Sequence, residues 1–276
     1  MSELFSGMIV LLWKSIFWNN HSIINKMTRL KNKIAVITGG STGIGLATAK
    51  TFIEEGARVI ITGRNEDTLA QAVVEIDSDR ITAIKSDTSK LSDIDTLAEQ
   101  IKSDFGRVDI LFANAGIAWF APLAQSDEAF FDAQFNTNVK GLFFTIQKLE
   151  PLMTEGGAIV LNASAAASKG FEGGAIYSAT KGAVRNFART LSTELAPKGI
   201  RVNVVSPGPI ETPIYGKMGM TEEQLQGMAE GFAAMVPMKR FGAASEVAKA
   251  VLFLASDDSS YVIGEEILVD GGIATL

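Results

Sequence analysis

From Lys33 onward, short runs rich in β-branched residues alternate with longer stretches of helical periodicity. Strands and helices that alternate in this way form βαβ units, whose strands lie parallel in one sheet. The runs are apolar nearly throughout, as is typical of strands buried on both faces. We therefore expect an α/β fold with a doubly wound, mostly parallel seven-stranded sheet and helices on both faces. The expected strands are Ile34–Thr38, Arg58–Thr62, Ile81–Lys85, Val108–Phe112, Ala158–Asn162, Arg201–Ser206 and Glu266–Val269.

The intervening stretches predict helices, and no linker or internal repeat marks a second domain. Residues 31–276 are expected to form one domain. Pro207–Phe241 lacks a clear period and carries five methionines, which predicts a substrate lid, or else a surface excursion with short helices. The expected helices are Ile44–Glu55, Glu66–Ile76, Leu91–Asp104, Asp127–Thr154, Ala175–Ala196 and Ala244–Ala255.

Residues 1–30 differ from the rest of the chain. Met8–Trp13 is apolar, but six residues are too few to span a bilayer, and the flanking sequence does not match a signal peptide. We expect no membrane span and interpret this extension as loosely attached or as a mis-assigned start before Met27. A helix lying on a membrane surface is the alternative.

Composition excludes several classes of function. The net charge of −6 lacks the basic excess of a nucleic-acid-binding protein. The chain has no cysteine, and His21 is its only histidine. These absences exclude disulfides, thiol nucleophiles and Ser-His-Asp hydrolysis, and they predict no metal site. A cytoplasmic enzyme fits best, with proton transfer by Tyr, Lys, Asp or Glu.

A glycine-rich turn joins the first expected strand to the first expected helix. Here a chain that binds a dinucleotide must approach a pyrophosphate closely at the helix N-terminus. The spacing is G-x-x-x-G-x-G, which departs from G-x-G-x-x-G. Such glycines can also form an ordinary turn, but the flanking strand and helix favour a cofactor site. The expected cofactor-binding residues of this turn are Gly39, Ser41, Thr42, Gly43, Ile44 and Gly45.

The end of the second expected strand distinguishes between the two nicotinamide cofactors. Sites for NAD place an acidic side chain there, on the ribose 2′-hydroxyl. This chain has Gly63 followed by Arg64, whose guanidinium suits a 2′-phosphate. We predict NADP(H) in preference to NAD(H), with Arg64 as the main anchor and Ser41 as a hydroxyl donor. The alternative is a solvated surface arginine.

Polar residues also follow the third and fourth expected strands. Asp87 and Thr88, and likewise Asn114, Ala115 and Gly116, fall at the carboxyl edge where ligands bind in open α/β sheets. Asp87 is a candidate acceptor for the adenine amino group. Asn114 is expected to tie neighbouring strands together, and Gly116 to let the backbone approach the adenosine. Each residue alone is an ordinary turn former.

The motif Tyr177-Ser-Ala-Thr-Lys181 places a phenol and an ammonium four residues apart, on one face of a helix. We expect the cation to lower the pKa of the phenol and so make a proton donor from a weak acid. With Ser164 upstream and the glycine turn, this pair predicts a nicotinamide-dependent carbonyl reductase or alcohol dehydrogenase.

Together these motifs resemble the short-chain dehydrogenase/reductase family over about residues 33–272. The resemblance implies a Rossmann-like fold and a catalytic group of Asn138, Ser164, Tyr177 and Lys181. It implies that Tyr177 exchanges the proton and also contacts the cofactor, that Ser164 binds the substrate oxygen, that Lys181 also binds the nicotinamide ribose, and that Asn138 holds a water. Asn136 competes with Asn138, but Asn138 with Gly141 matches the family form.

The loop after the sixth expected strand resembles the family's nicotinamide-side loop. The backbone of Ile210 and the hydroxyl of Thr212 would hold the carboxamide, next to Pro207 and Gly208. A proline-rich turn is the alternative. The resemblance also implies a homotetramer, or a homodimer, with the helix Ala175–Ala196 at an interface lined by small residues.

The sequence thus predicts an NADP(H)-dependent oxidoreductase that acts on a small-molecule ketone, secondary alcohol or 3-oxoacyl group. A 3-oxoacyl-carrier-protein reductase is one alternative, which would need a basic docking surface for its acidic partner. A catalytically idle cofactor-sensing protein on the same fold is another.

Overall fold

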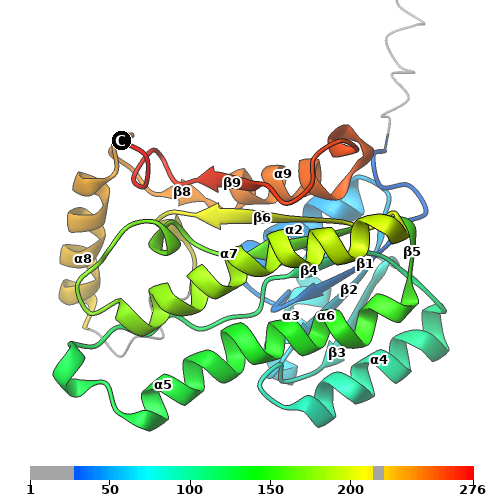
Figure 1. Cartoon of the computed structure of the whole chain (residues 1–276), viewed down its shortest axis with the longest axis horizontal. Helices are drawn as coiled ribbons and strands as arrows, with labels where there is room; N and C mark the ends of the chain where they lie inside the picture. The colour runs from blue at the N-terminus through cyan, green and yellow to red at the C-terminus, as the bar shows by residue number, and fades with distance from the viewer. Residues whose placement is uncertain (1–27, 214–220) are drawn as a thin grey trace, which may run out of the picture.

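The computed structural model describes residues 28–213 and 221–276 and contains one large sheet of seven strands. The strand order is β3-β2-β1-β4-β5-β6-β9, and all neighbouring pairs are parallel. The strand arrows point toward the end of the molecule where α8 lies (Figure 1). The predicted doubly wound sheet is confirmed. Its strands are β1 (Ile34–Thr38), β2 (Arg58–Gly63), β3 (Ile81–Lys85), β4 (Val108–Ala113), β5 (Met153–Asn162), β6 (Arg201–Pro207) and β9 (Glu266–Val269).

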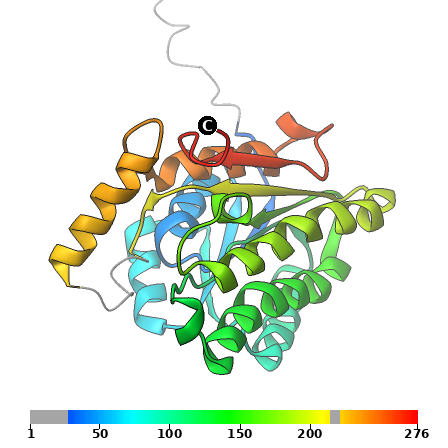
Figure 2. The same cartoon turned by 60° about the vertical axis from the view of Figure 1, so that its left-hand side comes forward.

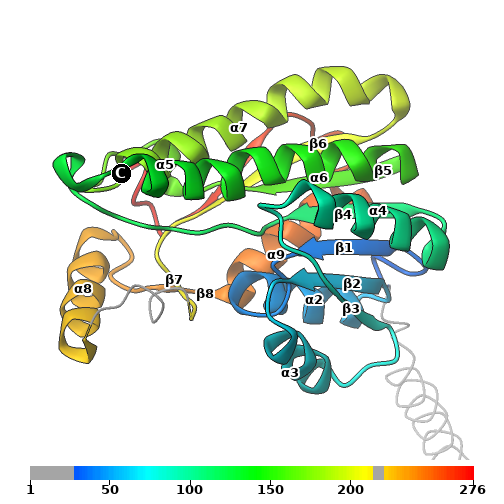
Figure 3. The same cartoon turned by 90° about the horizontal axis from the view of Figure 1, so that it is seen from below.

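Helices cover both faces of the sheet (Figures 2 and 3). Alternate side chains of one strand point to opposite faces, so Ile37 packs in one core and Val36 in the other. One core receives α2 (Gly43–Glu54), α3 (Glu66–Ile76) and α9 (Ala244–Ala255). The other receives α4 (Leu91–Phe105), α6 (Leu142–Leu149) and α7 (Ala175–Leu195).

The prediction of one helix over Asp127–Thr154 is wrong, because the helix is interrupted and because it ends earlier. It consists of α5 (Glu128–Phe135), a π-helical segment (Asn136–Gly141) and α6. After α6 the chain forms a 3-10 turn that contains Pro151, and β5 begins at Met153. Proline has no N–H for the helical ladder and its ring clashes with the preceding turn, so the helix ends earlier than predicted.

The stretch after β6 contains more regular structure than predicted. α8 (Glu222–Met235) is a helix of 14 residues, and β7 (Ile210–Glu211) pairs with β8 (Gly242–Ala243) in a small second sheet. Figure 1 places α8 beyond the carboxyl ends of the strands. Residues 214–220 lie outside the described residues, and a lid role for residues 207–241 stays a prediction.

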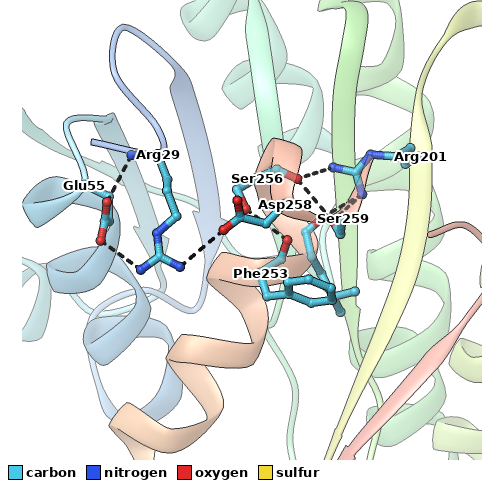
Figure 4. Close-up of polar contacts among 8 residues, drawn as sticks. Arg29, Glu55, Arg201, Phe253, Ser256, Asp258 and Ser259 are labelled. Carbon is cyan, nitrogen blue, oxygen red and sulfur yellow. Dashed lines mark hydrogen bonds and ion pairs between the residues drawn. The ribbon is translucent and has the colours of Figure 1, made fainter. Parts of the chain in front are cut away.

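The amino-terminal edge of the sheet is held by two arginines (Figure 4). Arg29 pairs with Glu55 at 3.2 Å and with Asp258 at 3.5 Å. Arg201 donates to Ser259 Oγ at 2.8 Å and to the carbonyl oxygens of two residues at the end of α9, Leu254 and Ser256. The Arg201 contacts satisfy carbonyl groups that the end of α9 leaves without helical partners.

The described chain starts within the segment that the sequence placed in the extension. Leu30 is fully buried in the core next to α2, and its N–H donates to Glu55 O at 2.9 Å. Residues 28–30 therefore pack on the domain. The earlier residues, with Met8–Trp13 and His21, lie outside the described part. Within residues 28–213 and 221–276, no helix is long and apolar enough to cross a membrane.

Candidate active site

The predicted site residues gather at the carboxyl edge of the sheet, around neighbouring strands β1 and β4. The chain leaves β1 into α2 on one face, and after β4 it reaches α5 and α6 on the other. Open α/β sheets bind ligands at such a switch point, because the two connections diverge there.

The glycine turn has the backbone that the sequence predicts. Gly39 and Gly43 have φ of +64° and +55°, in the left-handed region that favours glycine. A Cβ on Gly45 would overlap the carbonyl oxygen of Gly39. Thr42 precedes α2 without a side-chain cap, and the first turn has no acidic residue. The N–H groups there are available to an anion. Ser41 Oγ accepts from Thr68 Oγ1 at 3.4 Å, and Ile44 packs on the core.

Asn114 joins three strands through its side chain. Its Nδ2 donates to the carbonyl oxygens of Thr38 (2.9 Å) and Gly39 (3.1 Å), and its Oδ1 accepts from Asn162 Nδ2 at 2.8 Å. Thr38 Oγ1 in turn accepts from the N–H groups of Asn114 and Ala115, at 3.0 Å each. The prediction that Asn114 ties neighbouring strands is confirmed.

Arg64 and Ser41 lie at one corner of this edge. A Cβ on Gly63 would lie 3.3 Å from Ser41 Oγ, so the end of β2 closely approaches the glycine turn. Arg64, the next residue, is exposed, and within the described parts of the chain it makes no ion pair. Its guanidinium is therefore accessible to a ligand.

Asp87 and Thr88 follow β3 at the same edge. Asp87 Oδ1 accepts from the N–H and the hydroxyl of Ser89, at 3.0 and 2.8 Å, which fixes the carboxylate in a turn. Thr88 is buried, and its carbonyl oxygen would overlap a Cβ on Gly141 in the π-helical segment. Contact with adenine stays a prediction for Asp87.

Tyr177 and Lys181 lie in the first half of α7, with Lys181 Nζ 5.8 Å from the centroid of the phenol ring. Lys181 is buried, and its Nζ donates to Asn162 O at 2.7 Å. Burial lowers the pKa of the Lys181 ammonium to about 8. Tyr177 and Lys181 thus lie close together, as the i, i+4 spacing predicts. The Lys181 ammonium, however, lies near the Tyr177 ring and the Asn162 carbonyl, and among the described residues no contact of this ammonium with the phenol oxygen is seen.

The expected effect on the phenol is wrong for the protein by itself. Desolvation raises the pKa of Tyr177 above its ordinary value, and a hydrogen bond with Ser164 acts in the opposite direction. The spacing of two residues predicts whether they share a helix face, but it does not show how deeply they are buried. Here burial determines the direction in which the pKa of Tyr177 shifts.

Ser164 is fixed at the start of a 3-10 turn, Ala165–Ala167, just after β5. Its Oγ accepts from the N–H of Ala166 at 3.2 Å and also interacts with the Tyr177 hydroxyl. A hydroxyl in this position can donate to a further oxygen atom, as a substrate-binding group must.

Asn138 is buried in the π-helical segment and holds the loop that follows β4. Its Oδ1 accepts from Ile117 N at 2.8 Å, and its Nδ2 donates to Ile117 O at 2.9 Å and to Thr180 Oγ1 at 3.1 Å. A Cβ on Gly116 would lie 3.1 Å from Asn138 Oδ1 and 3.6 Å from Lys181 Nζ. Asn136 is only partly buried. Both amide hydrogens of Asn138 already form hydrogen bonds within the protein. The predicted water would therefore have to bind another polar group of Asn138.

The loop after β6 approaches the glycine turn. The Gly208 N–H donates to Val269 O at 3.0 Å, and a Cβ there would clash with Asp270. Ile210 is buried in the core, which leaves only its backbone for a ligand. The Thr212 methyl group lies 3.1 Å from where a Cβ on Gly43 would be. Contact with a carboxamide stays a prediction for this loop, including Pro207.

Comparisons with known proteins agree with this geometry. A family model described as enoyl-(acyl carrier protein) reductase matches residues 39–274. The oxidoreductase asL5 of Sarocladium schorii is 42% identical over 255 residues, which cover 92% of this chain and 100% of that protein. The chain belongs to the short-chain dehydrogenase/reductase family. It is therefore an oxidoreductase of a family that binds a nicotinamide cofactor.

Other members of the family are similar over nearly their whole length. The 3-oxoacyl-[acyl-carrier-protein] reductase FabG of Thermotoga maritima is 38% identical over 249 residues, 89% of this chain and 99% of that protein. A short-chain dehydrogenase/reductase from Brucella melitensis has a TM-score of 0.84 at 36% identity, covering 90% and 99% of the two chains. Levodione reductase has a TM-score of 0.84 at 32% identity, covering 89% and 99%.

The glycine turn fits the cofactor of a short-chain dehydrogenase/reductase. Positive φ at Gly39 and Gly43, the lack of space for a Cβ on Gly45, and an uncapped helix N-terminus leave a surface of backbone N–H groups for a pyrophosphate. Within the described residues, no group of three or more His, Cys, Asp or Glu side chains is placed to hold a metal ion.

Sequence reasoning did not single out two residues of this site. Asn162 provides the carbonyl that binds Lys181 and the amide that binds Asn114. Its place at the last position of an expected strand, two residues before Ser164, is the signal that marks it. Phe120, whose ring lies 5.5 Å from that of Tyr177, belongs to an irregular loop, and no sequence pattern predicts the contact.

Proposed function

We propose that the protein is an NADP(H)-dependent oxidoreductase that interconverts a ketone, or a 3-oxoacyl group, and a secondary alcohol, with Tyr177 as general acid and base. The observation that carries the proposal is the contact between the Tyr177 and Ser164 hydroxyls, next to the buried Lys181 and on the same sheet edge as the glycine turn. A proton donor, a hydroxyl for the substrate oxygen and a cation are thereby brought together.

In reduction, Tyr177 would donate its proton to the oxygen of the carbonyl group as negative charge develops there. The phenol is protonated at neutral pH, but burial raises the pKa of Tyr177 and so makes it a weaker acid in the protein by itself. The nearby positive charge of Lys181 would have to offset this effect. The Ser164 hydroxyl would donate to the same oxygen. Lys181, fixed by Asn162 O, would hold a positive charge near the phenolate that forms. The nicotinamide cofactor, when bound, supplies the hydride.

The preference for NADP(H) rests on Arg64. The sequence offers no carboxylate at Gly63, where NAD sites place one, and the exposed guanidinium of Arg64 lies next to the Ser41 corner. Arginine binds phosphate through two parallel hydrogen bonds, and Ser41 would add a third. Gly39, Thr42, Gly43, Gly45, Asn114, Ala115 and Gly116 would form the rest of the cradle.

Assembly as a homotetramer is part of the same proposal, and α7 would lie at an interface. A Cβ on Gly182 would meet nothing within 4 Å, and Ala179 is exposed, so these small residues do not pack closely within the protomer. Small side chains on an outward helix face allow close approach of a partner helix. A cytoplasmic location stays a prediction from composition.

A 3-oxoacyl-carrier-protein reductase is the second candidate, favoured by the similarity to FabG of Thermotoga maritima. Such an enzyme docks an acidic partner and needs basic side chains around its site. The cofactor-sensing alternative has no chemical need for Tyr177, Lys181, Ser164 and Asn138 together.

Substitution Tyr177→Phe tests the proposal. It removes the proton donor but keeps the ring, so NADPH oxidation with a ketone should fall about a hundredfold or more. NADPH binding, measured by fluorescence, should stay within about threefold, because the glycine turn is untouched. Undiminished turnover in Tyr177→Phe would exclude this residue as the acid. Cofactor binding without turnover of any carbonyl compound by the unmodified protein would favour the sensing alternative.

A further inference from the structure

The side of Tyr177 that faces solvent is bordered by an aromatic ring. The ring of Phe120 lies 5.5 Å from that of Tyr177, tilted by 53°. Phe120 is 40% exposed, whereas Lys181, the other group near the phenol ring, is 5% exposed. Lys181 therefore marks the interior side, and Phe120 borders the direction from which a substrate reaches the hydroxyl.

Two more rings continue this border. A Cβ on Gly174 would lie 3.5 Å from both Phe120 Cε1 and Phe171 Cβ, so these two phenylalanines flank the same glycine. The ring of Phe171 lies 6.3 Å from that of Phe232 on α8, in an edge arrangement. We call Phe120, Phe171 and Phe232 the aromatic border. It runs from the proton donor to the helix beyond the sheet edge.

The loop that carries Phe120 is fixed to its surroundings. Ile117 is bound through both backbone groups by Asn138, and Trp119 N donates to Gln134 Oε1 at 3.3 Å. Ala121 N donates to Gly173 O at 3.0 Å, which joins this loop to the segment that carries Phe171. Because these bonds lie on both sides of Phe120, its backbone is fixed before a ligand binds, which lowers the cost of ordering the loop on binding.

Charge on the three segments that form the border is mostly negative. The segments are residues 114–128, residues 163–175 and α8, and Lys169 is their one basic residue in the sequence. Its Nζ donates to Ile273 O at 3.0 Å. Two more cations bind these segments: Arg185 donates to Ser168 Oγ at 2.9 Å and pairs with Glu266, and Lys239 Nζ donates to Ala234 O at 2.7 Å. Carboxylates repel anionic substrates that approach through this surface. The exposed acidic side chains among the described residues of these segments are Asp127, Glu128, Glu172, Glu223 and Glu230.

We infer that the substrate is an uncharged ketone whose carbonyl group belongs to, or lies next to, a ring, and that Phe120 determines this specificity. A flat ring next to the carbonyl would pack on Phe120 when the oxygen reaches Tyr177 and Ser164, which gives the offset or edge contacts that aromatic pairs favour. The acidic surroundings disfavour carrier-protein and coenzyme A thioesters, whose carriers are anionic. This inference rests on the proposed ketone reductase function.

Two ketones with ten carbon atoms each test the proposed preference for a ring: β-tetralone, which has a fused aromatic ring, and the straight-chain methyl ketone 2-decanone. With NADPH, kcat/KM is expected to be about tenfold or more higher for β-tetralone. Phe120→Leu should remove most of this preference, because it keeps apolar contact and removes the ring. Phe131→Ala is the control: Phe131 is 43% exposed, and its ring stacks on Phe135 of its own helix, 4.3 Å away.

Binding gives a readout without turnover. In the Tyr177→Phe protein saturated with NADPH, calorimetry should show that adding Phe120→Leu weakens β-tetralone binding about tenfold, whereas adding Phe131→Ala leaves it unchanged. A thermal melt of each variant confirms that it folds. An equal loss for both ketones in Phe120→Leu would overturn the role of the ring.

Two thioesters test whether negative charge on a substrate lowers its turnover. Acetoacetyl-coenzyme A should be a poorer substrate than the uncharged N-acetylcysteamine thioester of the same acyl group. Preference for the coenzyme A thioester, or for the straight-chain ketone over β-tetralone, would overturn the inference and leave the proposed reductase standing. No NADPH oxidation with any of the four compounds would instead contradict the proposed function itself.

Discussion

In the proposed catalytic pair, burial shifts the pKa values of both side chains in opposite directions. The Tyr177 phenol and the Lys181 ammonium both lose solvent, which raises the pKa of the first and lowers the pKa of the second to about 8. Desolvation favours the neutral form of each group. In the free protein at neutral pH, Tyr177 therefore carries its proton, as an acid for ketone reduction must.

The lowered pKa of Lys181 predicts how stability depends on pH. Between about pH 8 and the unfolded value of 10.5, the unfolded chain holds a proton on Lys181 that the folded chain has lost. The free energy of unfolding therefore rises with pH in this window, by up to about 3 kcal/mol in total. Relative to Lys181→Met, which cannot titrate, the protein should gain stability in urea melts from pH 8 to pH 10. A constant difference would contradict the lowered pKa.

Arg64 is the single residue on which the predicted cofactor preference depends most. Arg64→Ala should weaken NADPH binding about tenfold to a hundredfold, because charge-assisted hydrogen bonds to the 2′-phosphate are lost. NADH lacks this phosphate, so its affinity should change less than about twofold. Fluorescence titration with both cofactors measures the two effects. If the preference between them is the same in the variant and the original protein, Arg64 is only a surface residue.

At the scale of elements, the turn between β1 and α2 depends on having no side chain at Gly45. Gly45→Ala places a Cβ against the carbonyl of Gly39, so it should lower the free energy of unfolding by about 1–3 kcal/mol and weaken cofactor binding. Gly231→Ala in α8 is the control, because a Cβ there meets nothing within 4 Å; it should stabilise by up to about 1 kcal/mol. Urea melts and NADPH titration measure both. Equal effects would contradict the close contact.

Local pattern predicted most elements of the fold. Ile34–Thr38, Ile81–Lys85, Glu66–Ile76 and Ala244–Ala255 have the predicted bounds, because their apolar period and flanking turn residues agree. The π-helical segment could not be predicted in this way. It places Asn138 on the backbone of Ile117 and Gly141 on that of Thr88, and both contacts are made with segments distant in sequence.

The site was predictable to a similar degree. The glycine turn and the Tyr177-Lys181 pair are local motifs, and the strand-end position of Asn114 follows from the expected sheet. The raised pKa of Tyr177 depends on burial, and the contact with Phe120 depends on how one loop packs against another. Neither leaves a periodic signal in the sequence.

For the whole molecule, the open space over Gly182 on α7 leads us to predict that protomers associate through this helix. Gly182→Trp fills the open space over Gly182 and should block a partner helix. The proposed tetramer should then not form, which light scattering after gel filtration measures. Gln71→Trp on α3 is the control at another exposed helix position. An original protein that is already monomeric would contradict the interface.

We propose above all that the carboxyl edge of this sheet binds NADPH and that the protein uses it to reduce a ketone. Fluorescence titration of the purified protein with NADPH and with NADH, followed by addition of a ketone in the same cuvette, tests it most directly. We predict tighter binding of NADPH and loss of its fluorescence when the ketone is added. Binding of neither cofactor would contradict a nicotinamide site at this edge.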